Sequence, residues 1–360
     1  MTQPVLSIRN LTVDIPTRYA VLRPVDKVSY DIAPGEILGV VGESGAGKSM
    51  AGNAVIGLLT PPAHISSGEV WLNGKRIDRL TPEQMRRVRG KDIGMVFQDP
   101  LTSLNPLLRI GDQLTETMLA HLPISRAEAE ERAVAALEEV GIPAARQRVN
   151  SYPHEFSGGM RQRVVIALAL CAEPSLVIAD EPTTALDVSV QAQIIALLKR
   201  LCRERGTAVM LITHDMGVIA EAADRVAVMY AGRLAELGPV REVLTAPRHP
   251  YTFGLMGSTP LASKGLKRLH QIPGSMPRLG RLPPGCAFSP RCPRAQDKCR
   301  HDPGPVIDAD GAAACWFPMD GTEGIGGDAT PPHGGARHLP DTSPTGARPG
   351  ADAGFTGGGA

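Results

Sequence analysis

Eight residues near the N-terminus have the types and the spacing needed to hold a chain of phosphates. Residues 42–49 read GESGAGKS and fit G-x-x-x-x-G-K-[ST], after an apolar run and before the helix-like residues 50–59. Glycines let the backbone curl so that amide N–H groups face phosphate oxygens, while Lys48 reaches the β and γ groups and Ser49 binds Mg²⁺. The alternative, a glycine turn with an incidental lysine, is disfavoured by the strand-to-helix context. The expected ATP contacts are Gly42, Ser44, Gly45, Ala46, Gly47, Lys48, Ser49 and Met50.

Two carboxylates, Asp180 and Glu181, follow directly on the apolar run Leu176–Ala179. Because the carboxyl ends of parallel strands meet at one edge of a sheet, we expect both side chains to lie near the phosphate loop. Asp180 would hold Mg²⁺ with its water shell, and Glu181 would polarise the water that attacks the terminal phosphate. The alternative is a solvated acidic turn before Pro182, which the nearby phosphate pattern makes the weaker interpretation.

A third motif lies upstream of this acidic strand, where residues 156–163 read FSGGMRQR. These residues resemble the signature motif of the ABC ATPase superfamily, and the resemblance extends over about residues 6–237. A serine and two glycines that open a helix form an anion site without a lysine of its own, which suits a γ-phosphate already held by a second subunit. Taken alone, the motif is also compatible with a plain N-cap on a helix over residues 159–171. The expected contacts across a dimer are Ser157, Gly158, Gly159 and Met160.

Four single residues stand where the resemblance implies further roles. Gln98 corresponds to the Q-loop glutamine, which touches the metal or the water, and His214 corresponds to the switch histidine at the γ-phosphate. Asp187 matches the D-loop residue that communicates across the dimer, and Tyr19 resembles the aromatic residue that stacks on adenine. Each of these residues taken alone would be read as an ordinary loop side chain, but their order along the chain supports the resemblance.

Two longer motifs narrow the family. Residues 98–106 (QDPLTSLNP) and residues 248–252 (RHPYT) resemble the ATPases of dipeptide, oligopeptide and nickel importers, over about residues 6–318. Within that group the chain is most similar to the D-type subunit, which is normally paired with an F-type paralogue. The resemblance implies ATP hydrolysis that drives import of peptides, or alternatively of nickel or another small solute. It also implies a second ATPase subunit (the F-type paralogue or a second copy), two transmembrane permease subunits and an external solute-binding protein.

Four cysteines crowd a loop-rich C-terminal region with the spacing C-x5-C-x6-C-x15-C, and they are Cys286, Cys292, Cys299 and Cys315. In a reducing compartment such a cluster favours a metal centre over disulfides. Some members of the family that the chain resembles bind a [4Fe–4S] cluster through this pattern. Tetrahedral zinc and unliganded thiols remain the alternatives, because the number of ligands does not select the metal.

Composition excludes several classes of protein. The 38 Lys and Arg residues nearly balance the 37 Asp and Glu residues, so we expect no nucleic-acid partner and regard a soluble ABC ATPase acting on nucleic acid as the weaker alternative. An iron–sulfur redox protein with an incidental ATP site is weaker still. The longest nearly apolar run, residues 164–172, is too short for a spanning helix, and residues 1–4 do not resemble a secretion signal. We therefore expect a cytosolic protein that does not span the membrane, and the family resemblance implies a peripheral position at the cytoplasmic face of the cell (inner) membrane.

The motifs require a framework that brings strand ends to the phosphate loop. Apolar runs alternate with helical patterns and predict an α/β P-loop fold with a mostly parallel sheet; they are residues 36–41, 93–97, 176–179, 209–213 and 226–230. Residues 5–15 alternate as an exposed edge strand should, and residues 127–140 predict a helix. The resemblance adds an N-terminal antiparallel β subdomain. The expected domains are a nucleotide-binding domain (1–246) with a helical signature subdomain (about 101–164), a C-terminal module (247–318) and a disordered tail (319–360).

Overall fold

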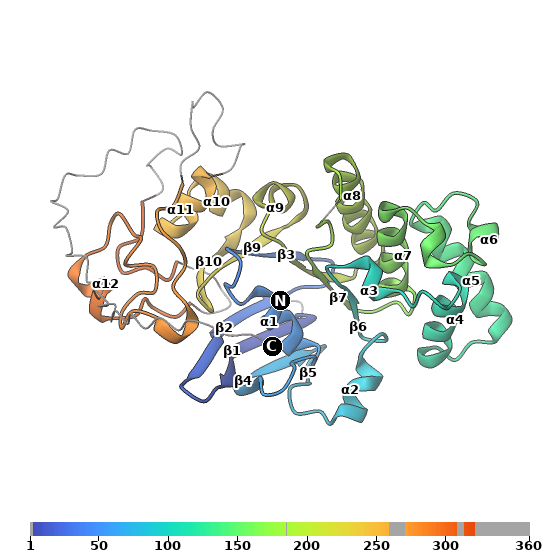
Figure 1. Ribbon diagram of the computed structural model, residues 1–360, viewed down its shortest axis with the longest axis horizontal. Coiled ribbons are helices and arrows are strands. Elements are labelled where there is room, and N and C mark those ends of the chain that lie inside the picture. The colour runs from blue at the N-terminus through green and yellow to red at the C-terminus, as the bar shows by residue number, and fades with distance from the viewer. Residues whose placement is uncertain (1–2, 185, 259–270, 308–312, 321–360) are drawn as a thin grey trace, which may run out of the picture. The chain divides into compact units, whose positions relative to one another are not determined.

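The computed structural model of the protein describes residues 3–184, 186–258, 271–307 and 313–320 (Figure 1). By its internal contacts the chain divides into residues 1–327 and residues 328–360, and all described residues belong to the first unit. The tail predicted to be disordered therefore lies, apart from residues 319 and 320, outside the described residues.

A six-stranded sheet forms the centre of the fold, with the order β10-β9-β3-β8-β7-β6. All neighbouring pairs are parallel except β9 and β10, which are antiparallel. The strands are β3 (Ile37–Val41), β6 (Ile93–Val96), β7 (Leu176–Asp180), β8 (Ala208–Ile212), β9 (Arg225–Tyr230) and β10 (Arg233–Pro239). Every residue of β3, β7 and β8 is buried, as continuous apolar runs covered on both faces predict.

This sheet separates the hydrophobic core into two clusters, because successive side chains of a strand point to opposite faces. On β7, Leu176 and Ile178 pack with the residues of the N-terminal sheet, while Val177 and Ala179 pack with the helices of the other face. Burying a large aliphatic side chain contributes about 1.5–3 kcal/mol. The apolar strand is thus held from both sides, and its polar end at Asp180 is placed at the edge of the sheet.

The smaller sheet is antiparallel, with the order β2-β1-β4-β5, as the family resemblance implies. Its strands are β1 (Leu6–Pro16), β2 (Val21–Ile32), β4 (His64–Leu72) and β5 (Lys75–Arg76). The expectation of an exposed edge strand over residues 5–15 is wrong, because β1 pairs with β2 on one side and with β4 on the other. The alternation of apolar and polar residues in β1 arises because one face of the strand packs on the core, where Leu6, Ile8 and Leu11 are fully buried.

Helices surround the central sheet. Between β6 and β7 the chain forms only helices, as the sequence predicts, and Figure 1 shows them gathered beside the β6 edge. They are α3 (Pro100–Ser103), α4 (Ile110–His121), α5 (Arg126–Glu139), α6 (Ala145–Arg148), the 3-10 helix η1 (Pro153–Glu155) and α7 (Gly158–Leu170). The other helices before residue 246 are α1 (Lys48–Val55), α2 (Pro82–Val88), α8 (Val188–Arg205), α9 (Met216–Ala222) and α10 (Val240–Thr245).

The C-terminal region has little regular secondary structure but is hydrogen-bonded to the central sheet. Its elements are α11 (Pro250–Gly257), the 3-10 helix η2 (Leu279–Arg281) and α12 (Asp297–His301). Ala314 N donates to the carbonyl of Ala235 on β10 (2.8 Å), and Met319 N donates to the carbonyl of Arg248 (2.8 Å). Among the described residues, every helix is too short or too polar to span a lipid bilayer.

Candidate active site

The phosphate loop connects β3 to α1, and three glycines give it its shape. Gly42, Gly45 and Gly47 have φ angles of 151°, 83° and 102°, which side chains of L-residues rarely adopt. A Cβ atom on Gly47 would lie 2.0 Å from the carbonyl oxygen of Pro24, and one on Gly42 would lie 2.2 Å from that of Met229. The loop therefore requires glycine both for its dihedral angles and for the close approach of neighbouring backbone.

Lys48 lies at the start of α1 and is almost fully buried. Its Nζ donates to the carbonyl oxygens of Gly42 (2.8 Å) and Glu43 (3.2 Å). Burial lowers the pKa of the Lys48 ammonium below its ordinary value, although the nearby charges of Glu181 and Asp180 act in the opposite direction. A buried cation that is held by the loop's own carbonyls is well placed to meet phosphate oxygens.

Ser49 and Asp180 come together from α1 and β7, since Ser49 Oγ donates to Asp180 Oδ1 at 2.9 Å. Burial raises the pKa of the Asp180 carboxyl, and the neighbouring Glu181 charge adds to that effect, whereas Ser49 and Lys48 oppose it. A hydroxyl and a carboxylate are oxygen ligands of the kind that Mg²⁺ takes alongside waters and phosphate oxygens. The residues present therefore fit the ion, and a bound cation would stabilise the ionised form of Asp180.

Glu181 is the meeting point of three side chains from separate segments. Its carboxylate accepts hydrogen bonds from Gln98 Nε2 (3.1 Å) and Thr184 Oγ1 (2.9 Å), and its Oε1 lies 3.1 Å from His214 Nδ1. Burial alone would raise the pKa of Glu181, but the hydrogen bonds of His214 and Thr184 and the charge of Lys48 lower it below its ordinary value. The carboxylate is thus kept ionised, as a proton acceptor must be.

The backbone of Glu181 is also unusual, because its φ of 47° lies in the left-handed region. This conformation costs a non-glycine residue roughly 1–3 kcal/mol, and such residues cluster at functional sites. It is held by the Glu181 N–H, which donates to the carbonyl of Ile212 on β8 (2.8 Å). The sequence does not single out Thr184, because a threonine three residues after an acidic pair is not a recognisable motif.

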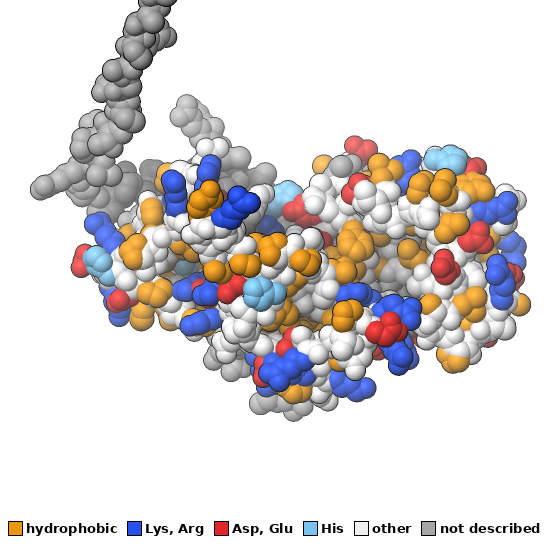
Figure 2. Space-filling model, turned by 60° about the horizontal axis from the view of Figure 1, so that its bottom comes forward, with side chains coloured by type: hydrophobic (Ala, Val, Ile, Leu, Met, Phe, Trp, Pro, Cys, Tyr) orange, Lys and Arg blue, Asp and Glu red, His pale blue; other side chains and the backbone are white. Residues whose placement is uncertain are grey.

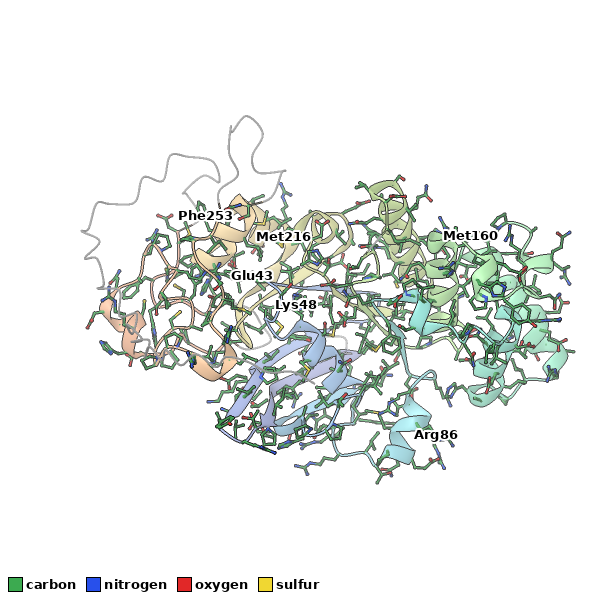
Figure 3. All side chains as sticks on the ribbon, in the orientation of Figure 1. Glu43, Lys48, Arg86, Met160, Met216 and Phe253 are labelled. Atoms are coloured by element: carbon green, nitrogen blue, oxygen red, sulfur yellow. The ribbon has the colours of Figure 1, made fainter. Side chains whose placement is uncertain are left out.

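The structure does not bring every expected residue to this site. Ser157 is the N-cap of α7 and is exposed, with its Oγ accepting from Met160 N at 3.4 Å. Figure 3 shows Met160 and Lys48 well apart in the molecule. The serine–glycine motif therefore cannot complete the phosphate site of its own chain, and it is free to face a second one.

Two other expected residues are also exposed and lie outside the cluster around Glu181. Tyr19, in the turn between β1 and β2, is 97% exposed, so its ring is open for stacking. Asp187 precedes α8 as its N-cap without a side-chain capping bond, and its neighbour Val188 is exposed as well. Exposure of this kind suits contacts with a ligand or with a second subunit, and neither residue contributes to the carboxylate cluster.

The four predicted metal ligands line one cavity of the C-terminal region, together with His249, Phe288 and Trp316. Burial raises the pKa of the thiols of Cys286 and Cys315, and it raises that of Cys292 to about 11. Throughout residues 3–320, where described, no group of three or more His, Cys, Asp or Glu side chains is arranged to hold a metal ion. The expected [4Fe–4S] cluster is therefore not supported, and neither is zinc, because the four cysteines line one cavity without being arranged as a set of metal ligands.

The fold and the site define an ATP-binding cassette. A family model described as ABC transporter matches residues 25–184. The solved dimer of MJ0796, a bacterial ABC transporter cassette, is 29% identical with a TM-score of 0.59, covering 66% of this chain and 99% of that one. A post-hydrolysis dimer of the same cassette bound to ADP and Pi has the same TM-score at 28% identity.

A second family model, the C-terminal region of oligopeptide/dipeptide transporters, matches residues 235–299. The dipeptide transport ATP-binding protein DppD of Bacillus subtilis (strain 168) is 47% identical over 318 residues, which are 88% of this chain and 95% of the relative. The oligopeptide transport ATP-binding protein OppD of Salmonella typhimurium (strain LT2) is 48% identical over 317 residues, 88% and 94% of the two chains. The chain belongs to this family of ABC transporter ATPases.

Proposed function

We propose that this chain binds and hydrolyses ATP to power the import of dipeptides or oligopeptides through an ABC transporter at the cytoplasmic face of the cell (inner) membrane. The observation that carries the proposal is the convergence of Gln98, Thr184 and His214 on Glu181, beside the buried Lys48. The peptide cargo is supported by relatives that are named as dipeptide and oligopeptide transport ATP-binding proteins.

In the proposed reaction the phosphate loop and Lys48 hold the β- and γ-phosphates of ATP. Mg²⁺, held by Ser49 and Asp180 with Gln98 near its water shell, would neutralise charge on these phosphates. Glu181 accepts a proton from a water molecule while the oxygen of that water bonds to the γ-phosphorus. The bond between the γ-phosphorus and the β–γ bridging oxygen breaks, which gives ADP and phosphate. His214 orients Glu181 and the γ-phosphate.

A second subunit completes each site in this proposal. Two ATPase subunits, either two copies or one copy with an F-type paralogue, would close head-to-tail on two ATP molecules. Each ATP would then lie between one subunit's phosphate loop and the other's Ser157–Met160 segment, and the exposure of Ser157 and Gly158 supports that placement. Tyr19 would stack on adenine, and Asp187 would pass the state of one site to the other. Because ATP and ADP differ in affinity for the closed pair, hydrolysis reopens it.

Two transmembrane permease subunits would form the path of the solute through the membrane, and an external solute-binding protein would deliver the solute to them. Apolar side chains next to the Gln98 loop support a docking surface for a permease helix: Leu101 is 62% exposed and Leu107 is 82% exposed. Figure 2 shows Lys and Arg interspersed with Asp and Glu on the face in view, a pattern that favours protein partners over nucleic acid. The proposal also divides the chain into a nucleotide-binding domain (1–246), a C-terminal module (247–318) and a tail (319–360).

The test is reconstitution of this chain in proteoliposomes with the permease subunits and paralogue that co-purify with it. We expect uptake of labelled peptide and a peptide-dependent increase in ATP hydrolysis, when the binding protein is present. Stimulation by Ni²⁺ with no response to peptides would instead favour the nickel-importer alternative. Co-purification with ribosomes or DNA, without multi-spanning proteins, would contradict the transporter function altogether.

A further inference from the structure

Glu43, the second residue of the phosphate loop, is held by the C-terminal region. Its backbone N–H donates to the Tyr251 hydroxyl on α11 (3.0 Å). Its carboxylate accepts from Arg291, whose Nη1 lies 2.9 Å and 3.1 Å from the two carboxylate oxygens. Figure 3 shows Glu43 on the α11 side of Lys48. The backbone N–H and the carboxylate of one loop residue are therefore both held by residues that lie more than 200 positions further along the chain.

The guanidinium of Arg291 is itself fixed in place. Its Nε donates to the carbonyl of Pro273 (2.9 Å), and its Nη1 lies 3.3 Å from the Tyr230 hydroxyl. The side chain of Arg291 is only 7% exposed, against 28% for Glu43. Because its guanidinium is buried, this ion pair is screened less than a surface pair and has less conformational freedom.

Tyr251 is also held in place by its neighbours. It is fully buried, and its ring packs with those of Tyr230 (4.6 Å between centroids) and Phe288 (5.4 Å). Its backbone N–H donates to Nδ1 of His249, the N-cap of α11, and the His249 N–H donates in turn to the buried carboxylate of Glu236. The Tyr251 hydroxyl, which accepts the hydrogen bond from Glu43 N–H, is thus positioned by the capped helix α11 and by the aromatic rings around it.

We propose that Arg291 and Tyr251 are positioning residues of the ATP site, acting through Glu43 to hold the phosphate loop in its nucleotide-binding conformation. A loop with glycines at positions 42, 45 and 47 has many conformations, and ordering it on binding costs free energy. Two attachments at Glu43 remove part of that cost before ATP arrives. A Cβ on Gly45 would lie 3.2 Å from the Met276 methyl, so the same region also packs on the tip of the loop.

This inference rests on the proposed role of the loop in binding ATP, and its test separates the two ideas. The variants are Arg291→Met, Glu43→Gln, the double variant, and Tyr251→Phe, each measured for ATP KM and kcat in the purified full chain. Losing one hydrogen-bonded attachment should raise the ATP KM about 3- to 10-fold, with a smaller change in kcat. Since Arg291 acts through Glu43, the double variant should be no worse than the more affected single variant.

Arg300→Met is the matched control, because Arg300 is exposed on α12 in the same region; its KM should equal that of the unmodified chain. If Arg291→Met fails to fold by thermal unfolding, Glu43→Gln and Tyr251→Phe decide the question from the other side of the contact. Unchanged KM in folded variants, or multiplicative effects in the double variant, would overturn the inference. Lys48→Ala should abolish ATP binding; normal binding by that variant would overturn the proposed site instead.

Discussion

Glu181 shows how much a single residue depends on its surroundings. Its carboxylate is bound by side chains from three segments, its pKa is lowered, and its backbone is held in a strained conformation. Strain of about 1–3 kcal/mol persists only where neighbouring structure over-determines it. Here the Ile212 carbonyl on the adjacent strand and the three side-chain contacts supply that constraint.

For Glu181→Gln we expect ATP hydrolysis to fall by roughly 10²- to 10⁴-fold, because an amide cannot accept the proton of the attacking water. ATP affinity should change little, since Gln keeps the size of the side chain. Phosphate release at saturating Mg-ATP, compared with nucleotide binding by the same preparation, measures both. Turnover near that of the unmodified chain would remove Glu181 from the role of base.

For Gly47→Ala we expect ATP binding weakened by at least about tenfold, or about 1.4 kcal/mol. The new Cβ would overlap the Pro24 carbonyl oxygen at 2.0 Å and would sit at a φ of 102°. Gly206→Ala is the control, because Gly206 also has a positive φ, of 67°, but a Cβ there meets nothing within 4 Å. That variant should lose about 1 kcal/mol of stability, by denaturant unfolding, and bind ATP normally. Equal ATP affinities in the two variants would argue against a special fit at Gly47.

Helix α11 connects the residues of the sequence motif RHPYT to the phosphate loop. His249 caps this helix through Nδ1, which accepts a hydrogen bond from the Tyr251 N–H. Nδ1 must therefore carry no proton, and the imidazole must be neutral. Burial lowers the pKa of His249 to about 4. The unfolded chain, with an ordinary histidine, therefore takes up a proton at higher pH than the folded chain.

The consequence is a loss of stability as the pH falls from about 6.5 to about 4. Between pH 7 and 4.5 the His249 contribution should cost on the order of 2 kcal/mol. His249→Asn is the matched variant, because Asn also caps helices but does not titrate. Denaturant unfolding at both pH values should show a larger loss for the unmodified chain than for His249→Asn, and parallel losses would contradict the prediction. Burial raises the pKa of Glu236, which has the opposite pH dependence, but Glu236 is present in both proteins and cancels in the comparison.

At the scale of the whole molecule, the site around Lys48 and the Ser157 motif lie apart in one chain. In the Glu181→Gln background we expect Mg-ATP to convert the chain, alone or with its paralogue, from monomer to dimer. Adding Ser157→Arg should weaken that dimer by at least tenfold, about 1.4 kcal/mol, because Ser157 is exposed and a long cation would occupy the partner's phosphate position. Light scattering with and without Mg-ATP measures the change. Dimerisation unaffected by Ser157→Arg, with ATP still bound, would contradict the shared site.

Sequence alone determined the features that depend on neighbours along the chain. The glycine loop is recognisable because only glycine tolerates the positive φ angles at residues 42, 45 and 47. The apolar runs of β3, β7 and β8 are recognisable because strands buried on both faces need no polar residues. These local requirements were sufficient to predict the fold class and to place Asp180 and Glu181 at the edge of the sheet.

Tertiary structure decided what depends on residues far apart in the chain. The alternation of apolar and polar residues in β1 predicts one buried face, but it does not predict that a strand pairs with β1 on each side. The cysteine spacing suggests metal ligands, but it does not show whether the thiols are arranged around a metal ion. Residues 98, 181 and 214 meet because three parallel strands end at one edge, and the contact between Glu43 and Arg291 joins positions 248 residues apart. Such contacts arise from the packing of whole elements, which no local pattern of side chains encodes.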